Sequence, residues 1–403
     1  MAARLKIGEA ANHSGGDGPM GILFWRGRVS KAEFRRQYVE AVRARMPQCV
    51  CRELPDEELA VGITGLTHDD EIVQRLSNAY AEFRKDPGER DRIFGRWLDS
   101  LMELGQPLVV ERTNILPLLK HRSWLDTAYD PVGAPPAGSA EELFHEVLND
   151  ELIVSYVVMR SGFSFLKRGD LSSAGIQEQE MRSLALANLR ARIDPPGFVD
   201  APVGWAISVG GNFEATMLID DEVWNDSRFA GEKTLLVAVP DRNSILASTD
   251  ASVSGVWNLA VMAKSLAASE NYPITNKLFV RRGAGFEPLD PPIVDLDHPI
   301  PRLDVLDVYR EIENGGPHLA IVIASPLGDD PRSVFRLFRK LEVYFDELDT
   351  RAVLKIPDAV ESRRPHIFIS IHRDSHPDVL ELAGSLGEQI AERGAVFILE
   401  KIE

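Results

Sequence analysis

The sequence predicts an α+β protein with an N-terminal helical section, a mixed and largely antiparallel sheet with helices, and then a separate small α/β sandwich of ββαβαβ order. Three observations predict it. Apolar residues recur at helical spacing up to about residue 103, strand-like runs joined by short turns follow, and 286–302 is rich in proline. The mixture of hairpins with intervening helices favours α+β over a doubly wound parallel sheet.

The N-terminal section begins with residues 1–20, which are polar and glycine-rich, so we expect a flexible tail there. The stretch 21–130 is expected to be mainly helical. Its first helix has Ser30 as N-cap and Glu33 at the capping-box position, followed by apolar residues at every fourth position.

Two further helices and a strand are predicted in the same stretch. A helix over 67–83 has Thr67 as its cap, and another over 93–101 follows an Asp-Pro-Gly break. Extended structure is then expected at 115–119.

Residues 131–285 are expected to form the sheet part. The run 152–159 is short, β-branched and apolar on both faces, which indicates a central strand. A helix at 141–148 leads into it, and 163–166 is its expected hairpin partner. A further helix is expected at 181–188.

Two hairpins and a buried helix complete this part. At 205–219, apolar residues alternate on both sides of Gly210-Gly211-Asn212, so we expect a hairpin there. A second hairpin is expected at 235–247, and a buried helix at 253–268.

The proline-rich segment 286–301 is expected to be a stiff linker, because its prolines remove amide donors and restrict the backbone. After it, 302–403 is expected to fold as a small α/β domain. Its strands are predicted at 304–312, 318–324, 366–371 and 395–399, with helices between the later ones.

Composition limits the function. Lys and Arg number 45 against 62 Asp and Glu, so the net charge is −17, and the pI is near 5.1. Nucleic acid is therefore an unlikely partner, because phosphate contacts need clustered basic residues. The same charge would be repelled by an anionic membrane surface, and no apolar run approaches the roughly 20 residues of a membrane span.

The start of the chain has no apolar segment of the secretory kind, and two cysteines, Cys49 and Cys51, make no disulfide framework. A cytoplasmic location is therefore expected. No cofactor is expected, and oligomeric state is left open.

Segments spread over 21–285 resemble the YtpQ family of bacterial proteins, a family of unknown function. They are FWRGRVSKAEF, NILPLLKHRSWL, DELIVSYVV, RSLALANL, GNFEATMLI, VAVPDRNSILAS and NYPITNKLF. The section 302–403 resembles a second small bacterial domain of unknown function. Neither resemblance implies catalytic residues.

Familiar catalytic signatures are missing from the sequence: it has no GxSxG, Walker A or HExxH motif. The most metal-like spacing is His372, Asp374 and His376, whose side chains would share one side of an extended segment. The same residues also fit an ordinary strand-to-helix connection, with Asp374 or Ser375 as the cap.

Basic and amide residues supply the candidate binding sites. Lys120 and Arg122 with Trp124 form the most basic patch that carries an aromatic residue, and it could hold a carboxylate or phosphate. Arg242 and Asn243, in a tight loop after Pro240, are candidates for binding the same kind of anion. The alternative for both is an ordinary surface turn.

Asn188 is expected on the apolar face of its helix. Because a buried amide must form hydrogen bonds, it either ties the helix to the sheet or lines a polar pocket.

The preferred functional hypothesis is a non-enzymatic protein-binding module of the immunity, antitoxin or conflict-system kind. Its acidic surface would attract a basic protein partner and speed the encounter. The alternative is a metal-dependent hydrolase or nuclease that uses the histidine and carboxylate clusters.

Overall fold

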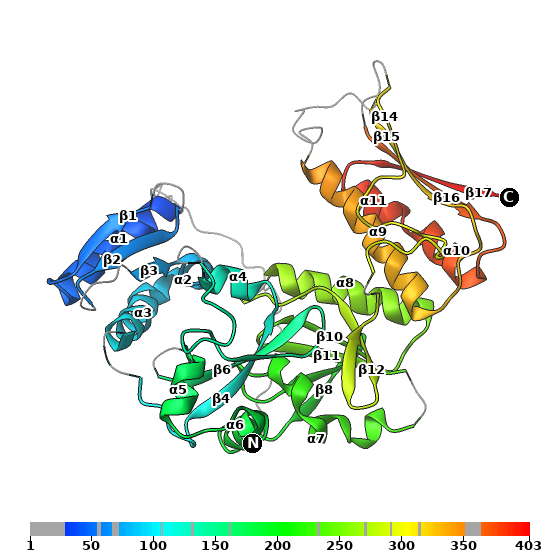
Figure 1. The fold of residues 1–403 in the computed structure, drawn as a ribbon. Coiled ribbons are helices and arrows are strands. Elements are labelled where there is room, and N and C mark those ends of the chain that lie inside the picture. The colour runs from blue at the N-terminus through cyan, green and yellow to red at the C-terminus, as the bar shows by residue number, and fades with distance from the viewer. Residues whose placement is uncertain are drawn as a thin grey trace, which may run out of the picture.

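The structure is a computed structural model. It describes residues 29–54, 58–66, 72–104, 106, 108–129, 133–160, 163–231, 234–269, 272–290, 292–312, 316–350 and 364–403. The tail expected at 1–20 lies outside this part. The fold is α+β with several mostly antiparallel sheets, as the sequence predicts (Figure 1).

The N-terminal unit packs helices against a small antiparallel sheet of order β1-β2-β3. Its elements are α1 Lys31–Arg45, β1 Val50–Glu53, β2 Ala60–Thr64, β3 Ile72–Arg75, α2 Ser77–Lys85, the 3-10 helix η1 Pro87–Glu89 and α3 Arg90–Leu104. Ser30 caps α1 as predicted, since its Oγ accepts the Glu33 amide at 3.1 Å. The aromatic ring of Phe34 lies at the centre of the core, about 5 Å from the rings of Tyr80, Phe83 and Phe94.

The helix predicted over 67–83 is only partly correct, because 72–75 is strand β3 and the helix begins at Ser77. Residues 67–71, including the proposed cap Thr67, lie outside the described residues. Ile72 pairs with Ile63 of β2, so the chain uses its apolar side chain in the sheet. In the sequence, Ile72 also continues the helical spacing of apolar residues by one turn, and the prediction of a longer helix was wrong for this reason.

Two sheets form the central unit. One has the order β4-β6-β5, with β7 also paired to β6, and the other has the order β13-β12-β10-β11-β9-β8. The elements are β4 Ile115–His121, α4 Trp124–Tyr129, β5 His145–Val147, β6 Leu152–Met159, β7 Phe163–Phe165, α5 Arg168–Ser173, the 3-10 helix η2 Glu178–Glu180, α6 Met181–Arg190, β8 Gly197–Ala201, β9 Gly204–Ser208, the 3-10 helix η3 Ala215–Ile219, α7 Asp221–Trp224, the 3-10 helix η4 Ser227–Phe229, β10 Leu236–Asp241, β11 Ser244–Ser248, α8 Val253–Ser269, β12 Leu278–Arg282 and β13 Gly285–Pro288.

Strand β10 shows how the second sheet is buried on both faces. Leu236 and Ala238 point into the core shared with α8, whereas Val237 and Val239 point into the core shared with the first sheet. A strand covered on both faces has no polar side, which explains the continuous apolar run in the sequence. The hairpin predicted at 235–247 is confirmed by β10 and β11, and the helix predicted at 253–268 by α8.

Two other predictions for this unit are wrong. In the hairpin expected at 205–219 the first arm is β9, but the second arm is the 3-10 helix η3. The carboxylate of Glu214 accepts the amides of Val209, Gly211 and Phe213, and this holds the chain in a tight loop. The helix expected at 141–148 is instead a turn followed by β5, which pairs with β6.

The C-terminal unit covers one face of a small sheet with helices (Figure 1). Its elements are β14 Val308–Arg310, β15 His318–Ile323, α9 Pro331–Thr350, β16 His366–His372, α10 Pro377–Ser385, α11 Gly387–Glu392 and β17 Val396–Ile402. β15, β16 and β17 are parallel, and β14 runs antiparallel to β15. Helix α8 joins this unit to the central one, with the rings of Trp257 and Phe338 5.2 Å apart.

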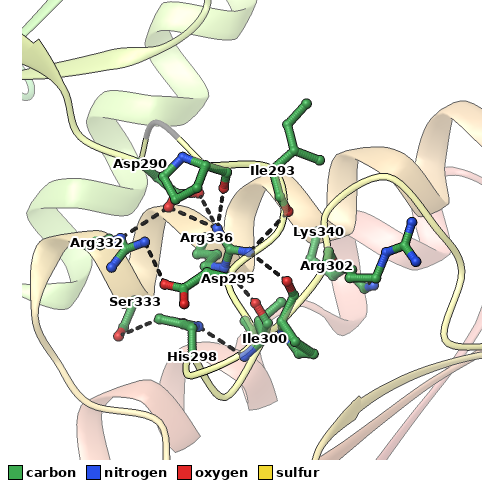
Figure 2. Close-up of polar contacts among 12 residues, drawn as sticks. Asp290, Ile293, Asp295, His298, Ile300, Arg302, Arg332, Ser333, Arg336 and Lys340 are labelled. Carbon is green, nitrogen blue, oxygen red and sulfur yellow. Dashed lines mark hydrogen bonds and ion pairs between the residues drawn. The ribbon is translucent and has the colours of Figure 1, made fainter.

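The proline-rich segment 286–301 starts inside β13 and then fastens to α9 (Figure 2). The fully buried guanidinium of Arg336 donates to Asp290 at 2.8 Å and to the carbonyls of Pro292, Ile293, Ile300 and Pro301. Arg332 donates to both Asp290 and Asp295. Helix α9 thus supplies side-chain donors to a segment whose prolines have no amide N–H of their own to donate.

Candidate functional site

Six residues from separate segments form what we call the cationic–aromatic cluster: Lys120, Trp124, Phe163, Phe165, Arg242 and Tyr272. Lys120 lies near the end of β4, and Trp124 begins α4 directly after it. β7 supplies both phenylalanines, and Arg242 occupies the turn between β10 and β11. The cluster therefore joins sequence-predicted residues that are far apart in the chain.

The Lys120 ammonium lies between two aromatic rings. Its Nζ is 5.4 Å from the centre of the Trp124 ring and 5.6 Å from that of Phe165, and these two rings are 4.4 Å apart. Burial, together with the smaller effect of the Arg242 charge, lowers the pKa of Lys120 to about 8. The side chain is half-buried, and its charge is stabilised by the π-faces.

Arg242 is held in a fixed orientation. Its guanidinium carbon lies 3.7 Å from the centre of the Tyr272 ring, and its Nη2 donates to Oδ1 of Asn212 at 2.9 Å. The Arg242 amide donates to the Tyr272 carbonyl, and the Arg242 carbonyl accepts the Ala215 amide. Burial lowers the pKa of Arg242. Backbone and side chain are thus both anchored.

Asn212 reaches Arg242 because of an uncommon backbone conformation. Its φ is 75°, in the left-handed region, which asparagine tolerates better than most residues. Glu214, which organises the loop, is buried and accepts three amides there. The loop that replaces the second hairpin arm therefore serves to position this side chain.

The cluster also borders the N-terminal unit. The Tyr272 hydroxyl donates to Oε1 of Glu82 at 3.2 Å, and Glu82 forms an ion pair with Arg96. Glu82 belongs to α2 and Arg96 to α3. Glu82, the carboxylate of this network, thus already forms an ion pair with Arg96 and not with Arg242.

The remaining predicted binding residues have other surroundings. Arg122 is exposed, and Asn243 is exposed with its Oδ1 3.4 Å from Arg242 Nε. Asn188 donates to the carbonyls of Arg112 and Ile115 at 2.7 and 3.0 Å, so it ties α6 to the beginning of β4. Of its two expected roles, the structure shows the tie between helix and sheet.

The histidines at the end of β16 act within the connection to α10. Nδ1 of His372 accepts the Asp374 amide, and His376, not Asp374 or Ser375, caps α10 by accepting the Asp378 amide at 3.4 Å. His376 also lies 3.5 Å from Asp329. Among the residues that the structure describes, no group of three His, Cys, Asp or Glu side chains could hold a metal ion.

A separate pocket of about 500 Å³ lies where α6 ends, and we call it the acidic pocket. Its carboxylates are Asp194, Asp220, Glu222 and Asp226, and Ile193, Phe198 and Val223 give it apolar walls. Arg190 reaches both Asp220 and Glu222, at 2.5 and 2.7 Å. From the sequence alone, Asp220 and Glu222 belong to a carboxylate cluster that could bind a divalent cation or form an ordinary solvated turn.

Sequence reasoning missed the aromatic members Phe163, Phe165 and Tyr272, as well as Asn212. The glycines before Asn212 signal a special turn, but nothing in the sequence joins that turn to Arg242. No helix in the described ranges is long and apolar enough to cross a membrane.

No family model, curated protein or solved structure matches the chain, so the resemblance to the YtpQ family stays an expectation from sequence motifs.

Proposed function

We propose that the chain is a non-enzymatic, cytoplasmic protein-binding module, of the immunity, antitoxin or conflict-system kind, whose partner is a basic protein. The observation that carries the proposal is the acidic pocket at the end of α6. It offers four carboxylates beside apolar walls, within a chain whose net charge is −17.

A basic side chain fits this pocket chemically. Lys and Arg bury their methylene stems against apolar surface while the charged end stays with polar groups. Ile193, Phe198 and Val223 can receive the stem, and the carboxylates can receive the charge. Arg190 pairs with Asp220 and Glu222, and Arg228 pairs with Asp226 at 2.9 Å, but Asp194 is exposed and has no ion pair with any described residue.

The overall charge supports the same partner class. Ion pairs within the chain remove one charge of each sign, so they leave the acidic excess unchanged. An excess of this size attracts a basic protein over distance and raises the association rate, and the effect weakens as salt is added.

The test is a pull-down at about 50 mM and about 500 mM salt with the whole chain as bait. We expect a basic protein at low salt, lost at high salt, and much less of it with an Asp194→Asn, Glu222→Gln bait. A Glu388→Gln, Glu392→Gln bait removes the same charge from exposed positions on α11 and should recover the partner normally. Recovery of the bait alone at low salt, or equal recovery by both variants, would refute the proposal.

The alternative of a metal-dependent hydrolase or nuclease is not favoured by any observation in the described ranges, since His372, Asp374 and His376 serve the turn before α10.

A further inference from the structure

Two basic side chains approach each other in this acidic chain without a carboxylate between them. Both lie over rings of strand β7: Lys120 Nζ is 5.6 Å from the centre of the Phe165 ring, and the Arg242 guanidinium carbon is 5.5 Å from that of Phe163. The charge of Arg242 also lowers the pKa of Lys120. Among the described residues, neither forms an ion pair, and the Lys120 ammonium donates no hydrogen bond. Two like charges in partly desolvated surroundings repel each other, so this arrangement requires an explanation.

Three buried or half-buried cations elsewhere have a carboxylate, whereas half-buried Arg281 donates to the Trp224 carbonyl and has no ion pair with any described residue. Arg336 has Asp290, Lys340 has Asp307 at 2.5 Å, and Lys277 has Glu151. The sequence contains more acids than bases, so acidic partners are plentiful. The cluster therefore differs from these three sites, where a carboxylate neutralises the cation.

The cluster has free N–H groups on Lys120, and on Arg242 it has a guanidinium held in a fixed plane with part of its N–H groups unused. All three Lys120 N–H groups lack a partner among the described residues, and its Nζ is not among the fully buried unpartnered atoms, so it keeps access to solvent. Arg242 uses Nη2 for Asn212 and Nε for Asn243, while stacking on Tyr272 fixes the plane of its fork. Donors oriented in advance suit an oxyanion, because little ordering is needed when it binds.

The two positive charges and the neighbouring aromatic side chains limit the class of ligand that fits the cluster. A phosphate monoester carries about −1.5 to −2 charges at pH 7 and three acceptor oxygens. It can neutralise both cations, whereas a carboxylate neutralises one. Trp124 and Phe165 lie beside Lys120, so an apolar or aromatic group on the ester would find a matching surface.

We propose that the cationic–aromatic cluster is a binding site for a phosphate monoester, with the phosphate between Lys120 and Arg242 and the organic group against Trp124 and Phe165. This site is additional to the acidic pocket and does not depend on the function proposed for it. The competing explanation is structural: each cation serves only to brace the aromatic side chains that it covers.

Calorimetric titration of the full chain at pH 7 with phenyl phosphate tests the site. We expect a dissociation constant below about 1 mM, weakened at least about tenfold by Lys120→Met and by Arg242→Gln. Lys401→Met removes an equal charge from an exposed position on β17 and should leave the constant unchanged. Lys120→Arg should retain most of the affinity.

Folding of the variants separates the two explanations. The backbone hydrogen bonds of Arg242 do not depend on its side chain, so Arg242→Gln can keep the turn. Removal of the repulsion should leave the melting midpoint of ligand-free Lys120→Met equal to or above that of the wild type. A lower midpoint together with unchanged affinity would establish the structural brace and overturn the proposal.

The choice of ligands completes the test. Inorganic phosphate should bind more weakly than phenyl phosphate, and benzoate more weakly still. Benzoate binding as tightly as phenyl phosphate, or no wild-type heat up to about 10 mM ligand, would overturn the proposal. The Asp194→Asn, Glu222→Gln variant should bind phenyl phosphate normally, so failure of the acidic-pocket proposal would not affect this result.

Discussion

Replacement of Arg336 by methionine tests how the proline-rich segment is held on α9. Methionine keeps an unbranched side chain but removes all six hydrogen bonds that the guanidinium donates. Among the described residues, Asp290, whose side chain is 1% exposed, then keeps only Arg332, at 3.1 Å from its Oδ1. The substitution therefore leaves a buried carboxylate half-compensated and removes the donor of the Pro292 and Ile300 carbonyls, while the carbonyls of Ile293 and Pro301 keep the amides of Leu303 and Asp295.

The expected loss is large because both residues are buried. Removing one partner of a buried ion pair costs about 3–5 kcal/mol, since the remaining charge stays without compensation. An unsatisfied buried acceptor adds about 1–3 kcal/mol unless water reaches it. We therefore expect Arg336→Met to lower the free energy of unfolding by about 4–6 kcal/mol. A matched change on the same helix, Arg339→Met, removes a 3.5 Å pair with Glu342, which keeps Lys264 at 2.8 Å, and should cost about 1 kcal/mol or less.

The assay is urea unfolding followed by far-ultraviolet circular dichroism, together with hydrogen exchange of residues 292–303. Exchange in that segment should rise strongly in Arg336→Met and little in Arg339→Met. Adding Asp290→Leu to Arg336→Met should recover part of the loss, because it removes the uncompensated charge. A loss below about 1 kcal/mol for Arg336→Met, with unchanged exchange, would refute the reasoning.

Three further predictions concern the central unit. The pKa of Lys120 is about 8 in the folded chain against 10.5 normally. Between these pH values the Lys120 side chain is protonated in the unfolded chain and largely deprotonated in the folded chain, so the free energy of unfolding should rise with pH. We expect a rise of at most about 3 kcal/mol from pH 8 to 10.5 relative to Lys120→Met. Urea unfolding of both proteins at each pH measures it. Glu214→Ala removes the acceptor of three amides and should lower the free energy of unfolding by about 2–4 kcal/mol. It should also broaden the Asn212 amide resonance. The control Glu287→Ala changes an exposed glutamate and should cost under about 0.5 kcal/mol. Gly204 has φ +130° and an added Cβ would collide with the Ala247 carbonyl, so Gly204→Ala should lower the melting midpoint by several degrees, and no change would contradict that geometry.

Local features of the fold could be predicted where neighbouring residues determine them. Ser30 and Glu33 determine the start of α1, and the turn after Pro240 determines the β10–β11 hairpin. Strand β6 follows from its two-faced apolar run. In each case the decisive contacts lie within a few residues, so the pattern contains the information.

Features fixed by distant contacts escaped prediction. The segment after Asn212 has the alternation of a strand, yet Glu214 folds it into a loop, and Leu119 of β4 donates to Thr216 of η3. Lys120 and Arg242 were recognised separately as candidates, but 122 residues separate them, and only the sheet topology brings them together. The aromatic walls come from β7, whose apolar residues resemble ordinary core residues in the sequence.

The two proposed sites can coexist because β4 separates them. Asn188 fixes α6, and with it Arg190 of the acidic pocket, to Ile115 at the beginning of β4, whereas Lys120 lies five residues further along the strand. At about 3.4 Å per residue, this places the backbones of Ile115 and Lys120 roughly 17 Å apart. Exposed charges at such a distance are largely screened at physiological salt, where the Debye length is about 8 Å. Glu82, the carboxylate that acts on Arg242, is paired with Arg96, so a bound anion at the cluster would balance a charge that this carboxylate does not neutralise alone.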